Sequence, residues 1–186
     1  MDASPFLTGQ YLLAMPGIGD PRFSRAVIAM CAHDENGALG IGVGATIEGL
    51  TLGDVLGQFD IEGAAVADTP VHFGGPVEPQ RGFVLHTPDW GGQDTIDVAG
   101  RWALSGTIDI LRAIADGSGP SRWLVALGYA GWGEGQLDAE MTKHGWLNVA
   151  AGTHLLFDTT AEARWRAGFA EAGIDPTMLA TGAGTA

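Results

Sequence analysis

The sequence predicts an α+β domain built on a mixed sheet. Apolar runs of strand length at residues 11–15, 26–33 and 37–44 are bounded by turn residues, and Asn36-Gly37 is a strong hairpin signal. Helical patterns interrupt the later strands without a regular βαβ repeat, which favours α+β over a doubly wound sheet. At 186 residues, a single domain spanning 1–186 is expected.

The middle of the chain continues this alternation. A short helix is expected at 52–59, followed by strands at 71–73, 83–86, 95–98 and 102–104. Ser105 is the candidate cap of the next helix, in which Ile108, Leu111 and Ala115 recur at helical spacing, and Gly117 ends it.

The remaining residues predict a buried strand, a glycine-rich link and two helices. The buried strand is expected at 122–127 and the glycine-rich link at 128–134. The first helix is expected at 135–143. The second helix starts at the capping-box sequence 159–162, ends at Gly173 and is prevented from continuing by Pro176. The small-residue tail 181–186 is expected to be frayed.

The charge of the chain argues against nucleic-acid and membrane partners. The formal net charge is -13, and the nine Lys and Arg residues are scattered. Nucleic-acid binding needs a clustered basic face, and anionic membranes repel an acidic protein. No apolar run approaches the roughly 20 residues of a spanning helix, and the first residues lack a basic signal-peptide region. We expect a cytoplasmic protein.

Cys31 is the single cysteine of the chain, so an internal disulfide is impossible and a cysteine-rich metal site is excluded. It lies within an apolar strand, where a small thiol packs as a hydrophobic group. A reactive cysteine would need an electropositive, partly exposed setting, so we interpret Cys31 as a core residue.

A first candidate binding feature is the sequence Gly74-Gly75-Pro76. Consecutive backbone N–H groups there can form a nest for an anion, with Arg81 supplying a positive charge. The alternative is a tight turn that requires unusual dihedral angles.

A second candidate lies on the helix after the glycine-rich link. Gln136 and Glu140 are one helical turn apart and can together orient a ligand, with Trp132 as a flat wall. In the alternative interpretation Glu140 pairs with Lys143, Gln136 bonds to the loop, and Trp132 belongs to the core.

The histidines show no metal-binding spacing, and a metal site would require His72 and His86 to meet across strands near Asp89. Phosphate-binding and dinucleotide-binding motifs are absent from the sequence, so no cofactor is predicted. Ser105 does not lie in a G-x-S-x-G nucleophile sequence.

Several ordered motifs make the chain resemble the YqgE/AlgH family of bacterial proteins. They include Leu13-Ala14-Met15-Pro16, His33-Asp34-Glu35-Asn36-Gly37, Gly82-Phe83-Val84-Leu85-His86 and the run from Gly128 to Leu137. Where the family usually has Asn, a basic residue and Pro, this chain has Gly44, Ala45 and Thr46.

The resemblance implies an α+β domain whose largely antiparallel sheet is curled into a partly closed barrel and flanked by helices. It also implies a bacterial cytosolic protein of unassigned biochemical activity. Members are often labelled transcriptional regulators, and this sequence contains no DNA-binding element that would support the label.

Three hypotheses about function follow. The leading one is a protein that binds a small anionic molecule or a protein partner, with any effect on transcription indirect. Its expected site combines Gly74, Gly75, Arg81, His86, Trp132, Gln136 and Glu140. The second is an enzyme, such as a hydrolase, in which His86 and Glu140 act as acid and base. The third, direct DNA binding, conflicts with the charge.

Overall fold

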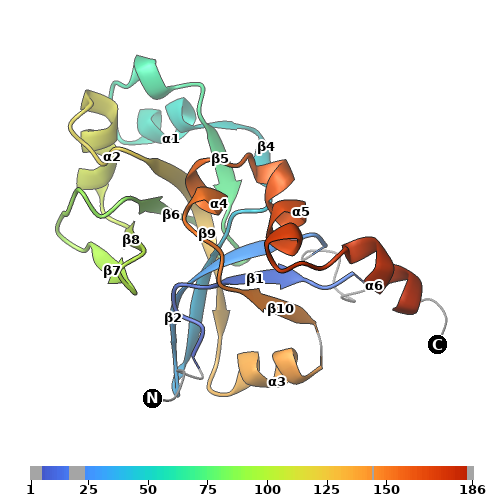
Figure 1. Ribbon diagram of the computed structural model, residues 1–186. Coiled ribbons are helices and arrows are strands. Elements are labelled where there is room, and N and C mark those ends of the chain that lie inside the picture. Colours follow the sequence, from blue (N-terminus) through green and yellow to red (C-terminus); the bar gives the residue numbers. More distant parts are fainter. Residues whose placement is uncertain (1–5, 17–23, 144, 184–186) are drawn as a thin grey trace.

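In the residues that the structure describes, the fold consists of ten strands and six α-helices (Figure 1). The computed structural model describes residues 6–16, 24–143 and 145–183. The strands are β1 (Tyr11–Ala14), β2 (Val27–Asp34), β3 (Gly37–Gly42), β4 (Thr46–Thr51), β5 (Pro70–Phe73), β6 (Val77–His86), β7 (Ile96–Val98), β8 (Trp102–Ser105), β9 (Trp123–Trp132) and β10 (Trp146–Val149). The helices are α1 (Leu52–Gln58), the 3-10 turn η2 (Ala64–Val66), α2 (Ile108–Asp116), α3 (Gln136–Thr142), α4 (His154–Phe157), α5 (Ala161–Glu171) and α6 (Pro176–Ala183).

The strands form one sheet in the order β10-β1-β2-β3-β9-β6-β8-β7, with β5 pairing to β9 and β4 to β5. Within the described residues every pairing is antiparallel except that of β5 with β9. The sheet curls but does not close, because β10 and β7 are its two ends. The predicted α+β class with a largely antiparallel, curled sheet is therefore confirmed, and the sheet is open.

Strand β9 joins the two halves of the sheet. Its first half pairs with β5 and β6, and its second half pairs with β3. The exchange of neighbours occurs at Gly128, which has a φ of 78°. A Cβ atom on Gly128 would lie 2.3 Å from the carbonyl oxygen of Gly75, so the β5–β6 connection crosses β9 at a distance that a side chain would not permit.

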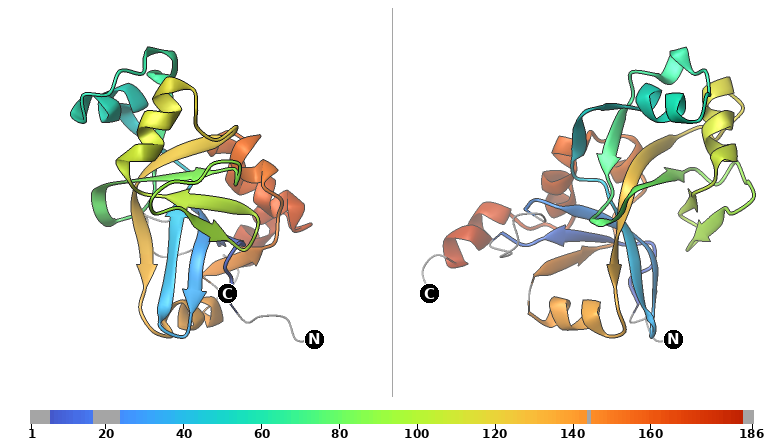
Figure 2. Two further views of the ribbon diagram at one scale, coloured as in Figure 1. Left: turned by 90° about the vertical axis from the view of Figure 1, so that its left-hand side faces the viewer. Right: turned by 180° about the vertical axis from the view of Figure 1, so that it is seen from behind.

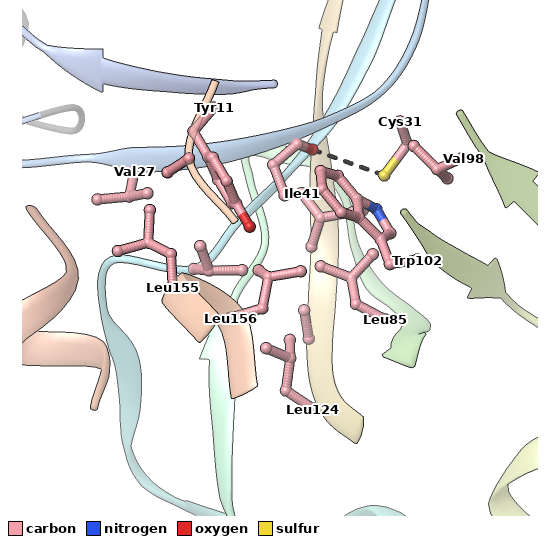
Figure 3. Packing of buried hydrophobic residues seen from close by; sticks show 14 of the residues in the cluster. Tyr11, Val27, Cys31, Ile41, Leu85, Val98, Trp102, Leu124, Leu155 and Leu156 are labelled. Atoms are coloured by element: carbon pink, nitrogen blue, oxygen red, sulfur yellow. Dashed lines mark hydrogen bonds between the residues drawn. The ribbon is translucent and has the colours of Figure 1, made fainter. Parts of the chain in front are cut away.

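The main core lies between the curled sheet and helices α4 and α5, and Figure 3 shows part of it. Tyr11 and Trp102 are fully buried at its centre, with ring centroids 5.5 Å apart. The Cys31 thiol donates to the Ala29 carbonyl, and burial raises its pKa to about 12. Its surroundings are those of a packing residue, as the sequence predicts.

Helix α5 covers β1 through its aromatic face. Trp165 donates from Nε1 to the Ala14 carbonyl at 2.9 Å, and its ring packs against Phe169 with centroids 4.9 Å apart.

Helices α1 and α2 lie together at the other end of the molecule, over a separate cluster that includes Leu52, Val55, Ile110 and Leu111 (Figure 2). None of the helices in the described ranges has the length and apolar character needed to cross a bilayer.

Several element predictions need correction. Ser105 ends β8, and Thr107 occupies the N-cap position of α2. Pro176 begins α6 instead of only ending a helix, since the first helical position needs no N–H donor. Helix α6 reaches Ala183, so the first part of the predicted frayed tail is helical, while 184–186 lie outside the described residues.

The predicted bounds of the glycine-rich link are also wrong. Strand β9 continues to Trp132, so most of the predicted link is strand, and only the residues between Trp132 and Gln136 form the turn. Strands β4 and β10 and helix α4 lacked a clear pattern in the sequence, because each is short and pairs or packs with partners distant in the chain.

Candidate functional site

A cavity of about 450 Å³ lies between helices α1 and α2 and the strands β6 and β9. This volume falls within the range of small-molecule sites, roughly 300–1,000 Å³. Figure 2 shows the two helices on the end of the molecule opposite α3. The lining residues are Leu50, Val55, Gln58, Phe59, Gln80, Gly82, Phe83, Val84, Ser105, Gly106, Thr107, Ile108, Ile110, Leu111, Val125 and Leu127.

Ten of the sixteen residues that line the cavity carry apolar side chains. Val84 and Val125 form its floor as a cross-strand pair of β6 and β9, and Ile110 and Leu111 of α2 close one side. At the rim, Phe59 is 46% exposed and Ile108 is 36% exposed. Large apolar side chains at a rim are costly to leave in water, so they favour an apolar occupant.

One end of the cavity is polar and is built at the junction of β8 and α2. Ser105, Gly106 and Thr107 line it there. The Asp94 carboxylate accepts from the Gly106 N–H at 3.0 Å and from the Thr107 hydroxyl at 3.0 Å. The Thr107 hydroxyl also contacts the Asp109 carboxylate. None of the residues that line the cavity carries a formal charge.

His86 supports this polar end from behind. It is fully buried, and its Nε2 lies 2.8 Å from the Ser105 hydroxyl, while its Nδ1 lies 2.8 Å from the Thr87 carbonyl. Burial lowers the pKa of His86, so the ring is neutral at pH 7. A carbonyl only accepts hydrogen bonds, so Nδ1 carries the proton and Nε2 accepts from Ser105.

The structure does not bring the predicted site residues to one surface. His86 pairs with Trp123 at the first residue of β9, whereas Trp132 is the last residue of that ten-residue strand. The two ends are roughly 30 Å apart at the rise of a strand. The expected common surface of His86 with Trp132, Gln136 and Glu140 is therefore wrong, and so is the expected His86–Glu140 acid–base pair.

Trp132, Gln136 and Glu140 do come together at the turn into α3. Glu140 accepts from Nε1 of Trp132 and of Trp146, each at 3.2 Å, and from the Gln136 side chain at 3.1 Å. Gln136 in turn accepts from the Gly133 N–H at 2.9 Å. These contacts hold the turn together, and they replace the alternative pairing of Glu140 with Lys143.

Gly74 and Arg81 each contact other parts of the protein. The Gly74 N–H, expected to bind an anion, donates to the Leu127 carbonyl at 2.8 Å. Arg81 instead lies 3.5 Å from the carboxylate of Glu78 and stacks over the Phe83 ring at 5.0 Å. Gly74 and Gly75 line a second cavity of about 60 Å³, to which Arg25 and not Arg81 contributes. Ligand binding by Gly74, Gly75 or Arg81 stays a prediction.

His72 does not meet His86 in a metal site. Its Nε2 accepts from the buried Arg164 at 2.7 Å, and its Nδ1 lies 3.1 Å from the Val125 carbonyl. Across the part of the chain that the structure describes, no three His, Cys, Asp or Glu side chains are grouped in a way that would hold a metal ion.

Comparison with known proteins decides the family. The model of the AlgH-like family matches residues 11–177. The chain belongs to the AlgH-like family. It is 59% identical to UPF0301 proteins of Rhizorhabdus wittichii and of Sphingopyxis alaskensis, over the full length of each chain.

Solved structures agree with this assignment. The solution structure of the AlgH protein from Pseudomonas aeruginosa matches with a TM-score of 0.82 and 38% identity over 96% of each chain. A crystal structure of a Corynebacterium diphtheriae protein matches with a TM-score of 0.72 over 97% of this chain and 93% of that one. At 18% identity, the second match shows the fold alone.

Sequence reasoning missed most of the cavity in this AlgH-like chain. The sequence indicates Ser105 only as a helix cap, and it gives no signal for the lining residues Gln58, Phe59, Gln80 and Thr107. The motif Gly82-Phe83-Val84 was noted, and its residues do line the cavity. The segment 44–46, where the chain departs from the family pattern, lies elsewhere, and its Gly44 and Ala45 line the small second cavity.

Proposed function

We propose that this AlgH-like protein is a cytosolic protein that binds a small, uncharged or amphipathic molecule in the 450 Å³ cavity between α1 and α2. The observation that carries the proposal is a cavity of this size in which most lining side chains are apolar, two rim side chains are exposed and apolar, and a few polar groups gather at one end, which is the usual composition of a ligand site. The free, buried Cys31 fits a reducing compartment. Any effect on transcription would then be indirect.

The arrangement of cations supports a role without direct nucleic-acid contact. Arg164 is buried, and Arg81 and Arg122 pair with the carboxylates of Glu78 and Asp158. Phosphate contacts need several unpaired cations on one face, and the chain as a whole carries a net charge of -13.

Binding of the neutral fluorophore N-phenyl-1-naphthylamine tests the proposal. We expect saturable fluorescence enhancement with the parent protein and a loss of at least about tenfold in affinity, or about 1.4 kcal/mol, in Gly82→Phe. A Cβ atom on Gly82 would meet only Leu127 Cδ2, at 3.8 Å, so the backbone tolerates a side chain at this lining position.

Gly91→Phe is the matched control, because a Cβ atom on Gly91 meets nothing within 4 Å and Gly91 does not line the cavity. It should bind the fluorophore like the parent. The proposal fails if the parent shows no saturable binding, or if both variants bind equally well while circular dichroism shows that both are folded.

A further inference from the structure

The polar end of the cavity contains two hydroxyl groups whose protons are already used within the protein. Because the neutral His86 accepts at Nε2, Ser105 donates its proton to that nitrogen. The Thr95 hydroxyl lies 2.8 Å from the Ser105 oxygen and itself accepts from the Gly92 N–H at 2.7 Å. Thr95 therefore donates to Ser105, and the chain of hydrogen bonds has one direction.

The second hydroxyl, that of Thr107, is committed in the same way. Its single proton serves the carboxylates of Asp94 and Asp109, neither of which can donate when ionised. The Thr107 hydroxyl, followed by the Gln93 N–H, holds the pKa of Asp109 below its ordinary value, so this carboxyl is ionised at pH 7. Ser105 and Thr107 can thus offer only lone pairs to a ligand.

The N-terminus of α2 does not reverse this preference. A helix N-terminus ordinarily attracts an anion, but here two carboxylates of the protein already occupy that position. Asp94 accepts from the Gly106 N–H, and Asp109 accepts from the Ile110 N–H at 3.0 Å. Asp94 Oδ2 would lie 3.2 Å from a Cβ atom on Gly106, which places a carboxylate oxygen directly beside the cavity wall.

Resting on the proposed function, we infer that the cavity selects ligands whose polar end donates hydrogen bonds, such as an alcohol or a primary amine on an apolar body, and rejects carboxylates. A hydroxyl or ammonium group satisfies the lone pairs of Ser105 and Thr107. A carboxylate offers no proton and would approach Asp94 and Asp109 with like charge. The ligand expected here is therefore not the anion that the sequence suggested.

Competition among three matched molecules tests the inference. Octylamine, 1-octanol and octanoate share one chain length, so they differ only in the head group, and each is titrated at pH 7 against the bound naphthylamine fluorophore. We expect octylamine and octanol to displace the fluorophore at concentrations at least about tenfold lower than octanoate. In Asp94→Asn, which removes one negative charge with little change in shape, displacement by octanoate should improve several-fold relative to displacement by octanol.

The outcomes separate the two ideas. If the fluorophore does not bind the parent protein, the proposed function itself fails. If it binds and octanoate displaces it as well as octanol does, or if none of the three molecules displaces it, the proposed function stands and the inference is wrong. Unchanged displacement by octanoate in a folded Asp94→Asn variant would also overturn the role given to the carboxylates.

Discussion

Arg164 is a buried cation that is held by carbonyl oxygens and by one neutral imidazole. Its guanidinium donates to the carbonyls of Val43, Leu155 and Leu156, and to His72 Nε2 at 2.7 Å. Two of these carbonyls belong to α4, whose last residues have no helical partners. These hydrogen bonds of Arg164 therefore hold α4 and α5 against the sheet. The bond to His72 requires a neutral imidazole, because a protonated Nε2 cannot accept.

This contact predicts a loss of stability in mild acid. Burial, followed by the Arg164 charge, lowers the pKa of His72 from 6.5 to about 4. Because the unfolded state binds the proton more readily, the stabilisation is fully present above about pH 6.5 and is lost as pH falls to about 4. The free energy of unfolding should decrease by roughly 3 kcal/mol across this window on account of His72.

Urea unfolding at several pH values measures this effect. His72→Gln retains a donor and an acceptor but does not titrate, so its stability should fall less between pH 6.5 and 4 than that of the parent. The control is His154→Gln, at an exposed histidine that pairs with Glu171. The free energy of unfolding of this variant should still show the decrease between pH 6.5 and 4 that His72 causes. Parallel curves for the parent and His72→Gln would contradict the prediction.

At the scale of elements, the turn from β9 into α3 depends on one carboxylate. Glu140 accepts from the indole N–H groups of Trp132 and Trp146, whose rings meet edge to face with centroids 6.4 Å apart. Trp132 is 8% exposed and packs with Leu137 and Met30 in a third cluster. The helix α3 is thus attached to β9 and β10 by both aromatic packing and hydrogen bonds.

Truncation of Trp132 should therefore be a folding defect. We expect Trp132→Ala to lower the free energy of unfolding by about 3–5 kcal/mol, as aromatic truncations in cores do. Trp132→Phe retains the ring contact but removes one hydrogen bond to Glu140, and should cost about 1–2 kcal/mol. Chemical denaturation distinguishes the variants, and an unchanged midpoint for Trp132→Ala would show that this side chain contributes little to the core.

At the scale of the whole molecule, the crossing of the β5–β6 connection over β9 determines the shape. Gly128 has Gly75 directly against it, and beyond this point β9 exchanges β5 for β3 as its neighbour. The cavity between α1 and α2 lies on one side of the crossing, and the Trp132–Glu140 turn lies on the other. This arrangement separates the two regions that the sequence placed together.

Comparison of two glycines measures the importance of the crossing. Gly128 and Gly117 have similar φ values, 78° and 84°, but a Cβ atom on Gly117 meets nothing within 4 Å. Gly117→Ala should cost about 1–2 kcal/mol for the left-handed backbone alone. In Gly128→Ala the added Cβ atom also collides with the Gly75 carbonyl, so this variant should lose several kcal/mol more or fail to fold. Thermal unfolding compares the two variants, and equal midpoints for Gly117→Ala and Gly128→Ala would contradict the role given to the crossing.

The sequence by itself determined the α+β class, the strands at β1, β2, β3 and β8, and the end of α2 at Gly117, because apolar periodicity and glycine at a helix end are local signals. It also indicated the core role of Cys31, since an apolar neighbourhood is visible in the chain. The motif Gly82-Phe83-Val84 pointed toward the cavity, although for a different reason.

Only the tertiary structure decided which of these residues meet. His86 and Trp132 both belong to motifs that contain glycine and aromatic residues. His86 nevertheless lies beside the first residue of β9 and Trp132 is its last, because β6 is antiparallel to β9. The partners of Ser105 come from β6 and from the loop before β7, and the partners of Arg164 come from the segment after β3, from β5 and from α4. Such contacts depend on strand register and helix docking, and these are fixed by the summed burial of the whole chain instead of by any local pattern.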